Sequence, residues 1–167
     1  VIGLERTKKH KSAGLRTYIL VAVGAGTIHD LTRYVAYTRN IQFVSIPTAA
    51  SVDGFVSSVA AMTWYGMKKT LTAVAPLCVL ADTRIFSKAP FRLTASGISD
   101  LMGKYTALLD WRICHMLTGE YLCETVYELE LEAVKEVENA LSEIKTGTSE
   151  ACEKLMYALI LSGLAMQ

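Results

Sequence analysis

A glycine-rich turn is the first feature that could do chemistry. Gly24-Ala25-Gly26-Thr27-Ile28-His29-Asp30 follows an apolar run and opens a helical pattern. Glycines let the backbone turn sharply and approach a ligand, and the N–H groups at a helix start favour phosphate. The dinucleotide fingerprint is incomplete, because His29 replaces the third glycine and no acid ends the next strand. A purely structural turn, with Thr27 as N-cap and Asp30 in a capping box, is slightly favoured by the local features alone.

A second candidate is the loop from Pro47 to Ser57, which follows an apolar strand pattern. It holds small residues, three hydroxyls and the carboxylate of Asp53. Small residues let a flat ligand lie against the backbone, and hydroxyls can bind its phosphates or ribose. Taken alone, however, the loop is better interpreted as a surface loop rich in turn formers.

A third candidate is the pair Asp100 and Lys104, which four-residue spacing places on one helix face. An exposed ion pair of this kind contributes only about 0.2–0.5 kcal/mol. The pair is flanked by Gly97 and Gly103, and a glycine inside a helix costs roughly 1 kcal/mol relative to alanine. We therefore expect a close approach that these glycines permit.

The other chemically active residue types favour structural roles. His115 has no His, Asp or Glu three or four positions away, so it is interpreted as a structural histidine rather than a ligand. Three cysteines are predicted to lie on helices as core or near-core thiols: Cys114, Cys123 and Cys152. The two tryptophans, Trp64 and Trp111, are predicted to be packing residues.

The first half of the chain predicts an α/β arrangement. The continuous apolar run Tyr18–Val23 suits a strand buried on both faces of a parallel sheet. A helix is expected from Thr27 to about Thr38, and further strands over Ile41–Ile46, ended by Pro47, and over Leu77–Ala81. Strand, crossover and strand in this order imply an incomplete Rossmann-like parallel sheet, with its functional loops at the carboxyl ends of the strands.

The second half predicts helices only. One helix is expected from about Ile98 to Thr118, ended by Gly119, and another from about Tyr121 to Lys145, ended by Gly147. A third opens at Thr148 or Ser149 and is still running at Gln167. The second helix carries one apolar face, formed by Val134, Val137, Leu141 and Ile144. We place the boundary near Ala89-Pro90, so residues 1–89 are predicted to be a partial nucleotide-binding α/β domain and residues 90–167 a partial all-α metal and substrate domain.

Composition narrows the class of protein. Of the 167 residues 51% are apolar and 20% charged, as in a soluble globular protein, and the net charge of +1 gives no reason to expect nucleic acid or an anionic membrane as partner. No apolar run reaches the roughly 20 residues of a membrane span, and no signal peptide is recognised. The four cysteines form no Cys-x-x-Cys pair, which favours reduced thiols in a cytoplasmic protein. The basic run near the N-terminus is interpreted as a solvated surface.

Taken together, the segments resemble the sn-glycerol-1-phosphate dehydrogenases, relatives of glycerol dehydrogenases, iron-type alcohol dehydrogenases and dehydroquinate synthases. The most specific stretches are Ile46-Pro-Thr-Ala-Ala-Ser-Val-Asp-Gly54 and Gly97-Ile-Ser-Asp-Leu-Met-Gly-Lys-Tyr-Thr-Ala107, with Asp110-Trp111. The resemblance covers Tyr18 to Gln167, whereas the first 17 residues look unlike the family. It implies a dehydroquinate synthase-like two-domain architecture, a role in glycerophospholipid metabolism (phospholipid biosynthesis) and a homo-oligomer.

The resemblance also implies roles for individual residues. Asp53 would contact the substrate, and Asp100 would be a catalytic residue that binds both the substrate and a divalent metal, zinc or nickel. The metal would polarise the ketone of dihydroxyacetone phosphate while a hydride arrives from NAD(P)H. The NAD or NADP cofactor would be bound by Gly26, Thr27, Ile28, His29, Asp30, Thr48, Ala49, Ala50, Ser51 and Ser57.

One departure from the family pattern concerns the metal. The family's two further ligands are histidines, and none of His10, His29 and His115 stands at a matching position. A catalytic zinc normally takes three protein ligands, so the chain alone is expected to be an inactive internal fragment. Two alternatives stay open: a dehydrogenase acting on glycerol or another alcohol, and a non-catalytic fragment with a nucleotide-contacting or dimerising surface. NAD against NADP and zinc against nickel are not decided by the sequence.

Overall fold

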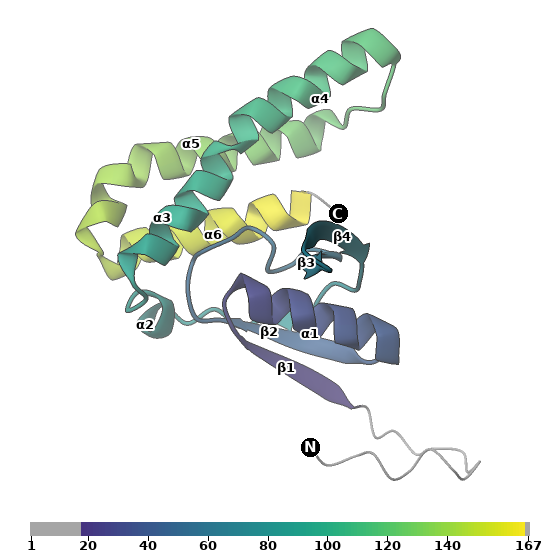
Figure 1. Ribbon diagram of the computed structural model, residues 1–167. Helices are drawn as coiled ribbons and strands as arrows, with labels where there is room; N and C mark the ends of the chain where they lie inside the picture. The colour runs from purple at the N-terminus through teal and green to yellow at the C-terminus, as the bar shows by residue number, and fades with distance from the viewer. Residues whose placement is uncertain (1–17, 166–167) are drawn as a thin grey trace.

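A computed structural model describes residues 18–165 and contains the expected parallel sheet. Strands β1 (Ile19–Gly24), β2 (Gln42–Pro47) and β5 (Cys78–Val79) pair in the order β1-β2-β5, with both pairs parallel. Helix α1 (Gly26–Arg39) connects β1 to β2 and packs on the sheet (Figure 1). The predicted strand, helix and strand are therefore confirmed, although β5 is only two residues long. Pro47 is the last residue of β2, where its missing N–H costs the ladder least.

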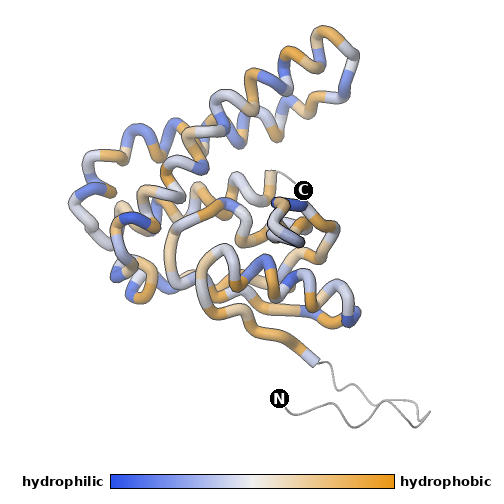
Figure 2. The backbone as a smooth tube through the Cα atoms, in the orientation of Figure 1, coloured by the Kyte–Doolittle hydropathy of each residue, from blue (hydrophilic) through white to orange (hydrophobic). Residues whose placement is uncertain are grey.

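The prediction that β1 is buried on both faces is wrong for the described residues. Ala22 is fully buried, but the alternate side chains Ile19, Val21 and Val23 are 46–57% exposed. Successive side chains of a strand point to opposite faces, and α1 covers the face that holds Ala22. Figure 2 shows β1 coloured as apolar along most of its length. Among residues 18–165, no element covers the face that carries Ile19, Val21 and Val23.

A β-hairpin was not predicted by the sequence. Strands β3 (Val59–Trp64) and β4 (Met67–Thr72) pair antiparallel around a two-residue turn. Tyr65 and Gly66 both adopt positive φ (48° and 78°), as a type I′ hairpin turn requires. Trp64 lies at this tip and is 44% exposed, and its ring packs edge-on against that of Tyr65, so its packing role is local to the hairpin rather than in the core. The strands lack a marked apolar alternation, which is why the pattern gave no signal.

Helices follow from α2 (Thr83–Phe86) onward. The single helix expected over residues 98–118 is two helices, α3 (Phe91–Met102) and α4 (Lys104–Thr118), separated at Gly103. Helices α5 (Glu124–Thr146) and α6 (Ser149–Ala165) complete the order. Gly119 and Gly147 end α4 and α5 in left-handed conformations (φ 74° and 72°), as predicted. No helix within residues 18–165 is long and apolar enough to cross a membrane.

The main core forms where α6 lies between the other helices and the loop after β2 (Figure 1). Leu155 and Leu159 of α6 are fully buried there. Three members of the predicted face of α5 are buried, but Leu141 is 37% exposed and lies outside the core. Ala50 and Phe55 belong to the same core cluster as the helical residues, so side chains from both sides of residue 89 pack together. The division into two domains at that residue stays a prediction.

The cysteines are free thiols. Cys152 is buried on α6 as expected and Cys114 is half-buried on α4, while Cys78 lies exposed in β5. Cys123 is the residue that precedes α5, so its predicted place on a helix is wrong. The basic run at residues 6–11 lies outside the described residues.

Candidate functional site

The loop of residues 48–58, after β2, runs between α1 and the helical core. Two helical glycines make this possible: a Cβ on Gly97 would lie 2.2 Å from the carbonyl oxygen of Ala50, and a Cβ on Gly163 would lie 2.2 Å from that of Asp53. The close approach expected at Gly97 is therefore confirmed. Gly103 makes no such contact, because a Cβ there would meet backbone only at 3.4 Å. Gly163 was missed, since a glycine in an apolar helix has no local signature that distinguishes it.

The loop is buried, so its interpretation as an ordinary surface loop is wrong. Ala49, Ala50 and Ser51 are at most 5% exposed. Ser57 is also buried, and its hydroxyl accepts a hydrogen bond from the N–H of Val59 at 3.1 Å. Thr48 is half-buried and donates its N–H to the carbonyl of Gly24 at 2.9 Å. The small residues thus serve close packing within the chain, and the loop lies against the glycine turn.

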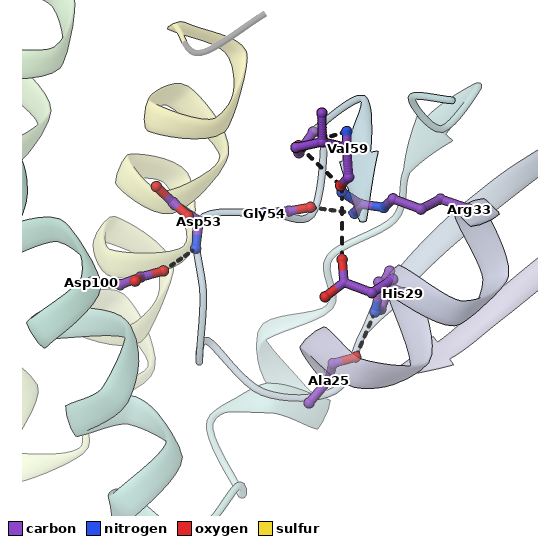
Figure 3. A network of polar contacts seen from close by, with 9 residues as sticks. Ala25, His29, Arg33, Asp53, Gly54, Val59 and Asp100 are labelled. Carbon is purple, nitrogen blue, oxygen red and sulfur yellow. Dashed lines mark hydrogen bonds and ion pairs between the residues drawn. The ribbon is translucent and has the colours of Figure 1, made fainter. Parts of the chain in front are cut away.

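Asp53 and Asp100, which are 47 positions apart in the sequence, meet at the edge of the helical core (Figure 3). The main-chain N–H of Asp53 donates to Oδ2 of Asp100 at 3.0 Å. The expected partner of Asp100, Lys104, instead places its Nζ 2.6 Å from Oδ2 of Asp53. The exposed i,i+4 pair is therefore replaced by a buried contact between α4 and the loop, because Lys104 is only 15% exposed.

The carboxyl group of Asp100 holds its proton more tightly than an ordinary aspartate. Partial burial is the main reason its pKa is raised, and the nearby charge of Asp53 adds to the effect. The hydrogen bond from the Asp53 N–H and the ammonium of Lys104 act in the opposite direction. Asp100 nevertheless stays exposed at the surface, unlike Asp53, which is buried. A carboxylate in this position can be reached by a ligand from solvent.

A buried polar cluster lies behind Asp53, and the sequence did not reveal it. The hydroxyl of Ser162 lies 2.6 Å from Oε1 of Glu130 and 3.1 Å from Oδ2 of Asp53. Lys104 Nζ is 3.8 Å from the same Oε1. Lys104 and Glu130 also line a cavity of about 240 Å³ together with Leu108 and Trp111. These partners come from three different helices, so no sequence spacing relates them.

The glycine turn at the carboxyl end of β1 differs from its prediction in one detail. Helix α1 has Ala25 as its N-cap, with no side-chain hydrogen bond, so the capping box of Thr27 and Asp30 is wrong. A Cβ on Gly26 would lie 3.2 Å from both methyl carbons of Val52. Gly26 does not adopt a positive φ. The glycine therefore allows a close contact with the loop rather than a left-handed turn.

His29 is part of this packing. Its side chain is almost fully buried, and its Nδ1 lies 2.9 Å from the carbonyl of Ala25 (Figure 3). Its ring meets that of Phe55 edge-on at 5.0 Å between centroids. Burial lowers its pKa, so the ring is neutral at pH 7. Nε2 has no hydrogen-bond partner within the described part of the chain. The imidazole holds α1 against the loop.

Arg33, which belongs to none of the sequence motifs, binds the loop from helix α1. Its guanidinium is fully buried and donates to the carbonyls of Gly54 and Val59, the latter at 2.9 Å (Figure 3). It also lies 3.8 Å from the carboxylate of Asp30. The pKa of Asp30 is raised, chiefly by burial. Asp30 thus faces Arg33 and helps to hold an internal cation.

Thr27 and Ile28 are the exposed members of the predicted cofactor set, on the first turn of α1. The structure brings this turn, residues 48–51 and the Asp53–Asp100 contact around a single loop. His115, by contrast, only binds the carbonyl of Glu120 at 2.7 Å, and Trp111 donates to that of Tyr121, so both have the structural roles expected. Within residues 18–165, no three His, Cys, Asp or Glu side chains are grouped so as to hold a metal ion.

Comparison with known proteins identifies curated relatives along most of the chain. The glycerol-1-phosphate dehydrogenase (NAD(P)+) of Geobacillus thermodenitrificans is 42% identical over 146 residues, which are 87% of this chain and 36% of the relative. The enzyme of the same name from Pyrococcus furiosus is 41% identical over 87% of this chain and 42% of the relative. The chain therefore spans well under half the length of these relatives.

Solved structures share the fold at low identity. A probable glycerol dehydrogenase from Sinorhizobium meliloti superposes with a TM-score of 0.77 at 24% identity, covering 89% of this chain and 44% of that one. An iron-containing alcohol dehydrogenase from Thermotoga maritima gives 0.71 at 22%, with the same coverage. The family model described as iron-containing alcohol dehydrogenase matches residues 4–90, so the view that the first 17 residues are unlike the family is wrong for residues 4–17. The chain belongs to the iron-containing alcohol dehydrogenase family.

Proposed function

We propose that these residues form the middle part of an NAD(P)-dependent glycerol-1-phosphate dehydrogenase, which interconverts dihydroxyacetone phosphate and sn-glycerol 1-phosphate. The observation that carries the proposal is the hydrogen bond from the Asp53 N–H to Asp100. It joins the two stretches of sequence most characteristic of that enzyme at one exposed edge. The identity of 41–42% with curated enzymes of this name supports the same choice.

Two groups of residues have different tasks in this proposal. Asp100, which is exposed, binds and orients the triose, because carboxylates accept hydrogen bonds from its hydroxyl groups. Asp53 is buried, and we propose that it presents a second carboxylate at the inner end of the same site. The first turn of α1 binds the cofactor, since the N–H groups at a helix start favour a pyrophosphate. Gly26 lets this turn lie against Val52. The loop between the two groups keeps the cofactor end and the substrate end at a fixed separation.

The cofactor residues proposed from the family pattern fall into two kinds. Thr27 and Ile28 are exposed, and Gly26 is half-buried, so a ligand can reach this turn. Ala49, Ala50, Ser51 and Ser57 are buried, His29 and Asp30 pack inside the chain, and Thr48 is half-buried with its N–H bonded to the carbonyl of Gly24. We propose that the second kind supports the loop and offers at most backbone groups to a nucleotide.

A divalent metal is part of the proposal, with Asp100 as one ligand. A bound metal of this kind polarises a ketone, and a bound nicotinamide supplies the hydride. Asp100 has the exposure that a ligand needs, but residues 18–165 hold no group of three candidate ligands. One carboxylate alone does not hold a catalytic metal, so the remaining ligands must come from other residues. Zinc or nickel, a cytoplasmic location, a homo-oligomer and a place in glycerophospholipid metabolism belong to the same proposal.

The experiment compares two ketones in a full-length dehydrogenase that carries these residues. NADH or NADPH oxidation is followed with dihydroxyacetone phosphate and, separately, with dihydroxyacetone. We expect turnover with the phosphorylated ketone to exceed that with the other by at least about tenfold in kcat/KM, or 1.4 kcal/mol. Preference for the unphosphorylated substrate would instead indicate a glycerol dehydrogenase. The 167-residue chain made alone is expected to show no turnover.

A further inference from the structure

The carboxylate of Asp53 is contacted by two side chains, and a third contacts both of them; the family pattern gives no role to any of the three. Lys104 of α4 and Ser162 of α6 both contact its Oδ2, at 2.6 and 3.1 Å. Glu130 of α5 contacts these two partners, Ser162 at 2.6 Å and Lys104 at 3.8 Å, and so acts on Asp53 through them. Glu130 is 4% exposed and Ser162 fully buried. The group thus connects three helices to one loop carboxylate.

Ser162 can donate its single hydroxyl hydrogen to only one of its two carboxylate neighbours. A serine hydroxyl has one hydrogen and accepts through its lone pairs. Two carboxylate oxygens lie within reach of it, and the shorter distance belongs to Glu130. The hydroxyl therefore takes its orientation from Glu130, and Lys104 lies between the two carboxylates. Glu130 thus contacts both side chains that Oδ2 of Asp53 contacts.

Stability alone is a poor reason for this arrangement. Two carboxylates face one ammonium, and Oε2 of Glu130 has no hydrogen-bond partner among residues 18–165. Replacing buried ionic groups by apolar residues is often neutral or stabilising. Helix α5 already buries Ala133 and Val137 one and two turns further along. An apolar residue at position 130 would extend that surface, so the charge is better explained by what it does to Asp53.

We propose that Glu130 and Ser162 are positioning residues that fix the carboxylate of Asp53 for the substrate, with Lys104 as the intermediate. The inference rests on the proposed function, because Asp53 is taken there as a substrate contact. It extends to Asp100 through the N–H of Asp53. Helices α5 and α6 then fix the position of Asp53 at the substrate end of the site, although Glu130 and Ser162 do not touch the substrate in this proposal.

The test uses Glu130→Gln and Ser162→Ala, with Glu138→Gln as the matched control. Glu138 also lies on α5 and also bonds a residue of α4, Tyr105 at 2.6 Å, but it is outside the cluster. In the 167-residue chain, hydrogen exchange of the Asp53 amide is compared with that of the Val137 amide in the core. We expect both cluster variants to raise the exchange rate of the Asp53 amide about tenfold relative to that of the Val137 amide. The control variant should leave the ratio of the two exchange rates unchanged.

The second readout is kinetic and uses the full-length dehydrogenase. Weakening a contact made to the bound substrate raises its KM, so we expect KM for dihydroxyacetone phosphate to rise about tenfold while KM for NADH is unchanged. Equal exchange ratios in cluster and control variants, or an unchanged KM for dihydroxyacetone phosphate, would overturn the positioning role. If Ser162→Ala does not fold, Glu130→Gln decides, because it keeps the size and an acceptor oxygen. A wild-type enzyme inactive on this ketone would refute the proposed function, whereas the exchange ratio would still decide the positioning of Asp53.

Discussion

Asp100 accepts a hydrogen bond from the main-chain N–H of Asp53, at 3.0 Å, across the junction between the loop after β2 and helix α3. The bond uses one carboxylate oxygen of Asp100 and leaves the side chain of Asp53 to face Lys104 and Ser162. A backbone donor cannot be removed by a side-chain substitution. The geometry of Asp100 is consequently tied to the path of the loop itself.

The metal role of Asp100 can be separated from this structural bond by Asp100→Asn. An amide oxygen still accepts from the Asp53 N–H, but it lacks the charge that a divalent cation needs. In the full-length dehydrogenase we expect the variant to lose most of its metal, measured by elemental analysis, with a melting temperature close to that of the metal-free wild type. Asp110→Asn, on exposed α4, is the control. Full metal content in Asp100→Asn would disprove the ligand assignment.

Gly97→Ala should destabilise the fold, because its Cβ would lie 2.2 Å from the carbonyl oxygen of Ala50. Overpacking of this kind costs typically about 1–3 kcal/mol. Gly103→Ala is the control, since its Cβ would meet backbone at 3.4 Å, an ordinary contact. Urea unfolding of the 167-residue chain measures both. A Gly97→Ala variant as stable as Gly103→Ala would mean that α3 does not pack on the loop as described.

Arg33→Met should also weaken the fold, by about 3 kcal/mol, because each buried carbonyl left without its donor costs about 1–3 kcal/mol. The two carbonyls are those of Gly54 and Val59. Arg39→Met, at the exposed end of the same helix, should change stability by less than about 0.5 kcal/mol. Chemical denaturation distinguishes them, and equal losses in the two variants would contradict the buried role of Arg33.

His29 should make stability fall as the pH is lowered. Burial lowers its pKa below the ordinary value of 6.5, so the unfolded chain takes up this proton first. The contribution of His29 to the free energy of unfolding is complete above pH 6.5 and is lost as the pH falls below it. The slope is at most about 1.4 kcal/mol per pH unit. Asp30 and Asp100, whose pKa values are raised, act in the opposite sense in more acidic solution.

The measurement compares wild type, His29→Gln and the control His115→Gln by denaturation from about pH 7.5 to about pH 5.5. The exposed His115 lies outside the core. We expect His29→Gln alone to flatten the profile. A profile as steep in His29→Gln as in wild type would place this histidine in solvent.

The sequence predicted what short-range patterns encode. Apolar runs and glycine stops placed β1, α1, β2 and the ends of α4 and α5, because periodicity and left-handed caps are local. It did not reveal the hairpin, whose strands show little alternation, or the break at Gly103, where the helical pattern continues on both sides. Solvent exposure of β1 depends on which elements cover it, which no local pattern records.

The sequence predicted only those site residues that stand in recognisable local stretches. Asp53 and Asp100 stand in recognisable stretches, and the structure brings them together. Arg33, Glu130 and Ser162 gave no signal, because their hydrogen-bond partners are 21 to 109 positions away. A buried cation or carboxylate on a helix looks like a solvated one until its neighbours are known. Long-range packing, rather than residue type, made them part of the site.

The most direct test of the central proposal is a graft. Residues 18–165 replace the matching segment of the Geobacillus thermodenitrificans glycerol-1-phosphate dehydrogenase, to which this chain is 42% identical, and the purified chimera is assayed with NADH and dihydroxyacetone phosphate. We predict turnover within about tenfold of the parent enzyme, abolished by Asp100→Asn in the grafted segment. A folded, metal-loaded chimera that oxidises glycerol but leaves dihydroxyacetone phosphate untouched would contradict the account.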